Sequence, residues 1–170
     1  MIIKIVGSAL IIAACGGFGL IIAITHKKEV TQLKALIETI SFMKCELQYK
    51  CTPLPVLCRS TAVFSNGLIR KYFEILFEEL SAQIFPDTKS CCLNALARVR
   101  DLPDSVNTVI LSLADTLGSF DLNGQLKGLD YAMNQAKQLL DKLTFDQDRR
   151  LRSYQTLALC AGAALAILLV

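Results

Sequence analysis

The sequence is poor in the side chains from which most catalytic and metal sites are built. It has one histidine among 170 residues, and His26 precedes two lysines at the end of an apolar run, a position typical of an interfacial residue rather than a general base. No cysteine has a CxxC partner or a histidine at zinc-ligand spacing. No glycine-rich segment is followed by the GK[ST] of a phosphate loop. These absences exclude the common zinc, redox and nucleotide sites.

Convergent acid and base groups are also missing. The acidic pairs, such as Glu78 with Glu79 and Asp146 with Asp148, have spacings typical of solvated helix faces. No nucleophile has a base at a recognisable spacing. We therefore predict that the protein is not an enzyme and that it needs no cofactor and no metal.

The formal net charge is only +3, and the charges are unevenly distributed. The middle of the chain is slightly acidic, whereas basic residues flank the two apolar ends: Lys27, Lys28, Arg149, Arg150 and Arg152. Nucleic-acid binding requires a continuous basic face. We therefore predict no nucleic-acid partner.

Apolar residues are abundant, at 53% of the chain, and the excess lies at its two ends. Residues 5–24 contain no charge, and residues 154–170 are apolar apart from a few polar residues at their start. A helix of the latter length reaches roughly 25 Å, the lower limit for crossing a bilayer. We predict transmembrane helices at residues 1–25 and 154–170. Because basic residues follow the first and precede the second, residues 26–153 are predicted to form a cytoplasmic domain.

Residues 12–15 support a competing interpretation, since Ile12-Ala13-Ala14-Cys15 fits the cleavage site of a lipoprotein signal peptide. The apolar run continues for nine residues past Cys15 and ends in lysines, which is typical of an uncleaved anchor. Two alternatives to the double membrane anchor therefore stay open: a lipid-anchored extracytoplasmic helical protein, and a simple, holin-like membrane protein.

Two stretches have the heptad spacing of helices that pack side by side. The apolar positions of residues 27–51 are Val30, Leu33, Ile37, Ile40 and Leu47, with Lys44 as an exception. Those of the stretch that begins at Asp121 are Leu122, Leu126, Leu129, Met133, Ala136, Leu140 and Leu143. Residues 121–170 contain no proline, which predicts one continuous helix that packs in water and then enters the membrane. The two helices are expected to lie antiparallel.

Prolines and single glycines divide the remaining chain. They predict helices at about 55–62, 65–84, 87–100 and 104–117, with the second of these at the centre of the core. Asp87 and Asp104 are predicted N-caps, and Gly118 is a predicted left-handed helix end. No segment alternates with the period of a strand. The predicted fold class is all-α, a helical bundle of about six helices in a cytoplasmic domain, flanked by an N-terminal and a C-terminal transmembrane helix.

The number of cysteines is seven, which is odd, and two of them, Cys15 and Cys160, fall in the apolar ends. We interpret the others as reduced, buried small residues. They are Cys45, Cys51, Cys58, Cys91 and Cys92. This interpretation fits a cytosolic domain.

Two motifs flank the predicted long helices. The first is Glu46-Leu47-Gln48-Tyr49 running into Thr52-Pro53-Leu54-Pro55, and the second is Leu117-Gly118 followed by Asp121 and Gln125. Together with the chain length and the two apolar ends, they resemble the stage III sporulation protein AB family of endospore-forming Firmicutes over essentially the whole chain. Val56 and Phe120 depart from that family's pattern. The family is in turn similar to the cytoplasmic domain of the type II secretion system F platform protein.

The resemblance implies a non-enzymatic platform in the mother-cell membrane around the forespore, as a component of the channel between the two cells. It implies two kinds of partner, the stage III sporulation ATPase and other channel components of the same operon. The candidate interaction residues are those of the two motifs: Tyr49, Thr52, Pro53, Leu54, Pro55, Leu117, Gly118, Asp121 and Gln125. The sequence leaves open whether the chain also forms a homo-oligomer.

Overall fold

The computed structural model contains six helices and, in the residues that it describes, no strand. It describes the backbone of residues 2–83, 85–118 and 121–169, and the side chains of residues 25, 27–83, 85–118 and 121–145. The helices are α1 (Ile2–Lys50), α2 (Leu54–Phe64), α3 (Gly67–Ala82), α4 (Thr88–Arg98), α5 (Asp104–Ala114) and α6 (Leu122–Leu169). The predicted all-α fold class is confirmed.

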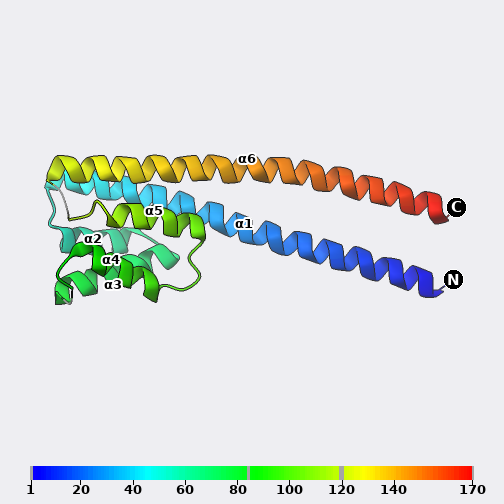
Figure 1. Cartoon of the computed structure of the whole chain (residues 1–170), viewed down its shortest axis with the longest axis horizontal. Coiled ribbons are helices and arrows are strands. Elements are labelled where there is room, and N and C mark those ends of the chain that lie inside the picture. The colour runs from blue at the N-terminus through cyan, green and yellow to red at the C-terminus, as the bar shows by residue number, and fades with distance from the viewer. Residues whose placement is uncertain (1, 84, 119–120, 170) are drawn as a thin grey trace.

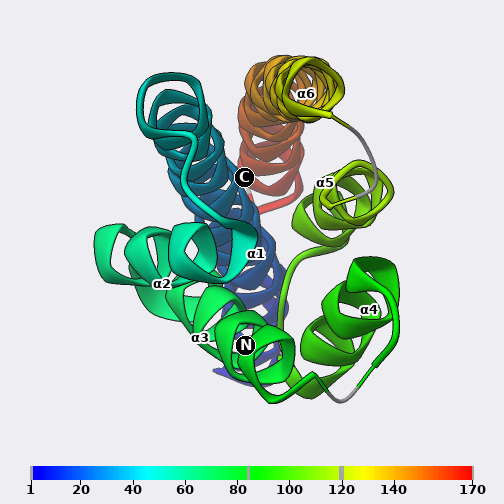
Figure 2. The ribbon, with the colours of Figure 1, turned by 90° about the vertical axis from the view of Figure 1, so that its left-hand side faces the viewer.

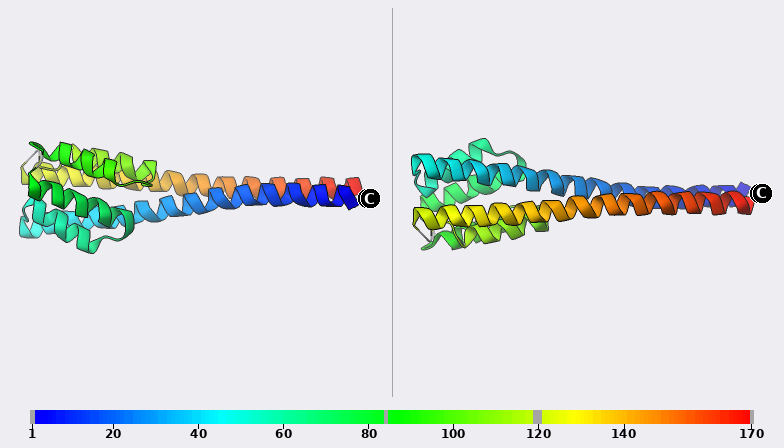
Figure 3. Two further views of the ribbon diagram at one scale, coloured as in Figure 1. Left: turned by 90° about the horizontal axis from the view of Figure 1, so that it is seen from below. Right: turned by 90° about the horizontal axis from the view of Figure 1, so that it is seen from above.

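The long helices α1 and α6 run antiparallel and side by side, as predicted, and the four short helices gather at one end of this pair (Figures 1 and 3). The two ends of the chain lie at the opposite end of the molecule (Figure 1). We call the end at which α1 stops and α6 begins the tip. Seen from the tip, α2 lies on one side of the bundle and α5 on the other (Figure 2).

The contact between α1 and α6, which we call the seam, explains why Lys44 interrupts the predicted heptad of α1. The Nζ atom of Lys44 lies 2.6 Å from Oδ1 of Asp130 on α6, so Lys44 forms an ion pair across the seam. The predicted heptad identified only part of the buried face of α1, because α1 packs against α2, α3 and α5 as well as α6. Leu36 and Met43, which the heptad omitted, are fully buried, whereas Ile37 is only partly buried.

The predicted apolar stripe of α6 is confirmed from Leu126 onward. Leu129 and Ala136 are fully buried, and the remaining members pack against the core: Leu126, Met133, Leu140 and Leu143. Leu122 does not belong to the core, since it is 40% exposed as the first residue of α6 at the tip.

Helix α3 buries its wide apolar face in the core, as predicted, although the helix itself lies at one edge of the bundle and not at its centre (Figure 2). Tyr72, Phe73 and Leu76 are fully buried, and the rings of Tyr72 and Phe73 meet edge to face with centroids 5.1 Å apart. The helix contacts α1, α2 and α4. Burial of these large side chains supplies much of the hydrophobic free energy of folding.

Prolines and polar caps begin the short helices near the predicted residues. Asp87 caps α4, because its Oδ2 accepts a hydrogen bond of 2.8 Å from the backbone N–H of Ser90. The prediction for Asp104 was wrong: Pro103 holds the cap position and Asp104 is the first helical residue, with no side-chain cap hydrogen bond. The acidic side chain still lies in the first turn, where the helix dipole favours a negative charge.

Two sequence-based interpretations fail because the burial of the residues concerned depends on how the helices pack against one another. Glu79 is 1% exposed and not solvated, since α4 packs over it and supplies hydrogen bonds from Asn94 and Arg98. Cys45 and Cys51 are exposed, whereas Cys58, Cys91 and Cys92 are buried as expected, and all five are free thiols.

The predicted membrane segments, 1–25 and 154–170, lie outside the residues whose side chains are described, apart from Thr25. In the described part of the chain, no helix has the length and apolar character needed to cross a membrane.

Candidate interaction surface at the tip

The first predicted motif forms the turn between α1 and α2. Tyr49 is 79% exposed near the end of α1, and Cys51 ends the helix with a left-handed φ of 48°. Pro53 occupies the cap position of α2, with Pro55 in its first turn. A proline is favourable there because the first helical N–H groups have no partner within the helix. The tight turn leaves the Tyr49 ring in solvent.

The second motif forms the connection between α5 and α6. Leu117 is buried, and Gly118 has a φ of 74°, as its predicted left-handed conformation requires. Asp121 caps α6, since its Oδ1 accepts a hydrogen bond of 3.0 Å from the backbone N–H of Gly124. The backbone N–H of Gln125 donates to the carbonyl of Asp121 at 2.9 Å in the first turn.

The two motifs meet at the tip. A Cβ atom at Gly118 would lie 3.3 Å from a methyl carbon of Leu54 and 2.5 Å from the hydroxyl oxygen of Thr88, the first residue of α4. The glycine is therefore required twice, for its positive φ and for this close approach. Residues far apart in the sequence thus form one surface at the tip.

Polar interactions hold the same surface in place. Two hydrogen bonds of 2.8 Å from Ser90, one from its backbone N–H and one from its hydroxyl, lower the pKa of Asp87 below its usual range. Lys89 pairs with Asp115 at 2.7 Å, which links the start of α4 to the end of α5. The tip is therefore a defined surface with an exposed aromatic ring and mixed charges.

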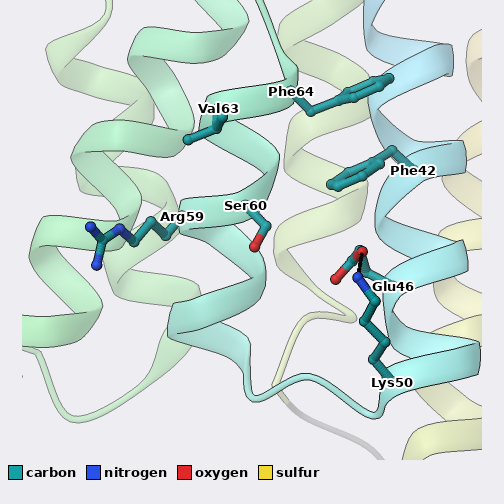
Figure 4. A pocket seen from close by; sticks show the side chains of 7 residues that line it. All are labelled: Phe42, Glu46, Lys50, Arg59, Ser60, Val63 and Phe64. Carbon is teal, nitrogen blue, oxygen red and sulfur yellow. Dashed lines mark hydrogen bonds and ion pairs between the residues drawn. The ribbon is translucent and has the colours of Figure 1, made fainter.

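Sequence reasoning missed one surface feature, a pair of stacked rings on the side of the bundle. The rings of Phe42 on α1 and Phe64 on α2 are nearly parallel, with centroids 4.4 Å apart and an interplanar angle of 4°. Figure 4 shows the hollow beside this pair, between α1 and α2. Phe42 lies beside the predicted heptad positions and Phe64 beyond the predicted end of its helix, so periodicity gave no signal for either.

Metal ligands do not gather in the part of the chain that the structure describes, where no group of three or more His, Cys, Asp or Glu side chains could hold an ion.

Fold and surface together define an all-α protein in which two long antiparallel helices carry a small helical body with an interaction surface at its tip. The family model of stage III sporulation protein AB matches residues 4–170. The chain belongs to this family, which is a structural component of sporulation and not a known enzyme family.

A solved structure described as "Stage III sporulation protein AB (SpoIIIAB)" has the same fold. The TM-score is 0.64 at 20% sequence identity, and the match covers 72% of this chain and 98% of that chain. A comparison with curated proteins found no match.

Proposed function

We propose that this protein is a non-enzymatic membrane platform of the channel between mother cell and forespore, and that its tip docks a secretion-type ATPase. Family membership supports the role in sporulation. The observation that carries the docking proposal is the meeting of the two motifs at Leu54 and Gly118. A surface assembled from two distant motifs, at the end of the molecule farthest from the chain termini, is well placed to meet a soluble partner.

Tyr49 is the residue of the tip best suited to anchor a partner. It is 79% exposed, and tyrosine is enriched among residues that dominate binding energies because it buries a large area with few rotatable bonds. The fixed turn that follows it lowers the ordering cost of binding.

Co-purification of the full chain with the ATPase, in lipid nanodiscs, tests the docking proposal. We expect Tyr49→Ala to weaken binding by about tenfold or more, the loss of roughly 1.4 kcal/mol or more. The matched control is Tyr131→Ala, because Tyr131 is 63% exposed on α6 away from the motifs. Equal binding by the wild type and both variants would refute docking at the tip.

Thiol labelling in intact cells tests the orientation. Cys51 is an exposed native reporter at the tip, in a chain in which Cys15, Cys160 and the other exposed thiol, Cys45, are replaced by alanine. We expect an impermeant maleimide to react with Cys51 only after the cells are permeabilised. Labelling of Cys51 from outside would overturn the cytoplasmic platform and favour the lipid-anchored alternative. That alternative also requires palmitate incorporation that is lost in Cys15→Ala.

A further inference from the structure

A hollow adjoins the stacked Phe42–Phe64 pair on the side of α1 that faces α6. It is lined by residues from three helices, among them Ser41 and Cys45 of α1 and Met133 of α6. Ser41 and Cys45 are exposed and short, so they leave a depression between the larger side chains that flank them. We call this depression the α1 hollow. The ring of Phe64, which is 46% exposed, stands at its edge.

The hollow on the other side of the ring stack, between α1 and α2, has a neutral lining. Arg59 points away from it (Figure 4) and lies over the ring of Phe77, with 5.7 Å between the guanidinium carbon and the ring centroid. Lys50 is neutralised by Glu46 at 2.6 Å. Charge therefore selects no occupant on that side.

The ring stack and the α1 hollow lie at the same height along the long helices. The ion pair of Lys44 with Asp130 fixes the register of α1 against α6. Because the two helices run antiparallel, Met133 lies beside about Ser41. Phe64 contacts α1 at the next position along that helix, through the ring stack. Stack and hollow are therefore neighbours around α1, and neither lies closer to the tip.

Two charges of opposite sign border the α1 hollow without a partner. Glu38 and Lys137 both line it, and both are exposed. Neither forms an ion pair with another described residue. The register places Lys137 beside about Ile37, so the two charges also lie at one height. A neutral surface that carries one free acid and one free base can complement a second copy of itself.

The lateral arrangement of the helices fits such a contact. Helices α2 and α6 both contact α1, and in the described residues they do not contact each other, so that α1 separates them (Figure 2). Packed helices have axes about 8–10 Å apart, which gives α2 and α6 similar distances from α1. A two-fold axis that passes in front of α1 therefore brings the α2 side of one copy opposite the α6 side of the other.

We propose that two copies of this chain form a parallel, symmetric dimer, in which the Phe42–Phe64 stack of each copy occupies the α1 hollow of the other. Copies anchored in one membrane have the same orientation, so the two-fold axis runs along the long helices and leaves every residue at its own height. The same operation brings Glu38 of each copy opposite Lys137 of the other. The contact rests on the membrane anchoring of the proposed function. It is independent of ATPase docking, because it uses neither motif at the tip.

Thiol crosslinking of the full chain, in lipid nanodiscs large enough for two copies, tests this contact. Cys45 is an exposed native thiol in the α1 hollow, and it is kept while Cys15, Cys51 and Cys160 are replaced by alanine. We expect a short bismaleimide to give a covalent dimer. The matched control lacks Cys45 and carries Lys71→Cys, at an exposed position on α3, and is expected to stay monomeric.

Charge exchange between copies separates this contact from effects within one chain. Glu38→Lys places a lysine opposite Lys137, and Lys137→Glu places a glutamate opposite Glu38. Each single variant should therefore lower the dimer yield about fivefold or more. An equal mixture of the two single variants should recover the yield, because every lysine then faces a glutamate of the other copy. Neither a folding defect nor an ion pair within one chain would give this recovery.

Four results would overturn the proposal. One is the absence of a dimer although Cys45 reacts with a monofunctional maleimide. Another is a dimer whose yield is the same in the wild type and in both single variants. A third is a mixture of the variants that recovers no dimer. Protection of Cys45 from the monofunctional reagent, without a dimer, would assign the hollow to lipid or to another occupant.

Incorporation into the nanodiscs separates this proposal from the proposed function. A chain that does not enter nanodiscs would refute the membrane anchoring on which both depend. An incorporated chain that binds the ATPase but gives no dimer would refute the dimer contact alone.

Discussion

The body around α3 and the seam between α1 and α6 are stabilised in different ways. In the body, Tyr72 and Phe73 are fully buried among side chains from α1, α2 and α4. In the seam, Leu129 and Ala136 of α6 are fully buried, and partly buried side chains such as Met133 share the packing with the ion pair of Lys44 and Asp130, whose side chains are 31% and 43% exposed. The body is therefore expected to set the stability, and the seam to set the alignment of the long helices.

Truncation of a buried aromatic ring in the body should change the free energy of unfolding more than any other substitution considered. Phe73→Ala should lower the free energy of unfolding by about 3–5 kcal/mol, because it removes a fully buried ring and leaves a cavity. In the seam, the partly buried Met133→Ala should cost only about 1 kcal/mol. Urea unfolding of the full chain in detergent, followed by circular dichroism, measures both. Equal losses would show that the seam is as critical as the body.

Removing a partner of the buried carboxylate is the next largest perturbation. Oε1 of Glu79 accepts hydrogen bonds from Asn94 and, at 3.3 Å, from Arg98, while its Oε2 has no hydrogen-bond partner in the described residues. Asn94→Ala should therefore cost about 2 kcal/mol, since the carboxylate stays buried with less compensation. Asn134→Ala, at an exposed position of α6, is the control and should change the same urea midpoint little. An unchanged midpoint in both variants would contradict the role assigned to Glu79.

Alkaline pH should weaken the body and not the seam. Burial raises the pKa of Cys92 from 9.0 to about 11, so the folded state holds its proton where the unfolded state has lost it. The stabilisation is complete below pH 9 and is lost as the pH rises toward 11, by about 2 kcal/mol. Cys92→Ala should make this decline shallower in a stability profile measured between pH 8 and 11, and the remaining decline comes from Cys58, whose pKa burial also raises. A profile that the substitution leaves unchanged would contradict this account.

The seam ion pair should have the smallest effect. A double-mutant cycle with Lys44→Ala and Asp130→Ala should give a coupling free energy of about 0.2–1 kcal/mol, because both side chains are partly solvated. The coupling should decrease in high salt. A coupling well above this range, insensitive to salt, would show that the seam is stabilised as the body is.

The same comparison separates what the sequence could predict from what it could not. Prolines and glycines act locally, so the ends of the helices were predicted within a few residues, and the long heptads identified the antiparallel pair. Glu79 and Leu36 were misjudged because their environment comes from the packing of other helices against their own, of α4 over Glu79 and of several helices around α1. Lys44 appeared to interrupt its heptad because its ion-pair partner, Asp130, lies on α6, which is distant in sequence.

The candidate surface was predictable only in part. Both motifs were identified by resemblance, and Gly118 was assigned its left-handed conformation from residue type alone. Their meeting was not predictable, because Leu54 and Gly118 are brought together by the packing of the short helices. The stacked Phe42 and Phe64 rings also escaped notice, since neither lies at a periodic position of its helix.

The unbroken course of α1 and α6 has a mechanical consequence. Each is a single helix, of 49 and 48 residues, roughly 70 Å long, and the body is attached at one end only. The pair therefore extends far beyond the body as one long arm. A partner that tilts the tip by about 5° would displace the far ends by about 6 Å, so a small movement imposed at the tip is amplified at the opposite end of the molecule.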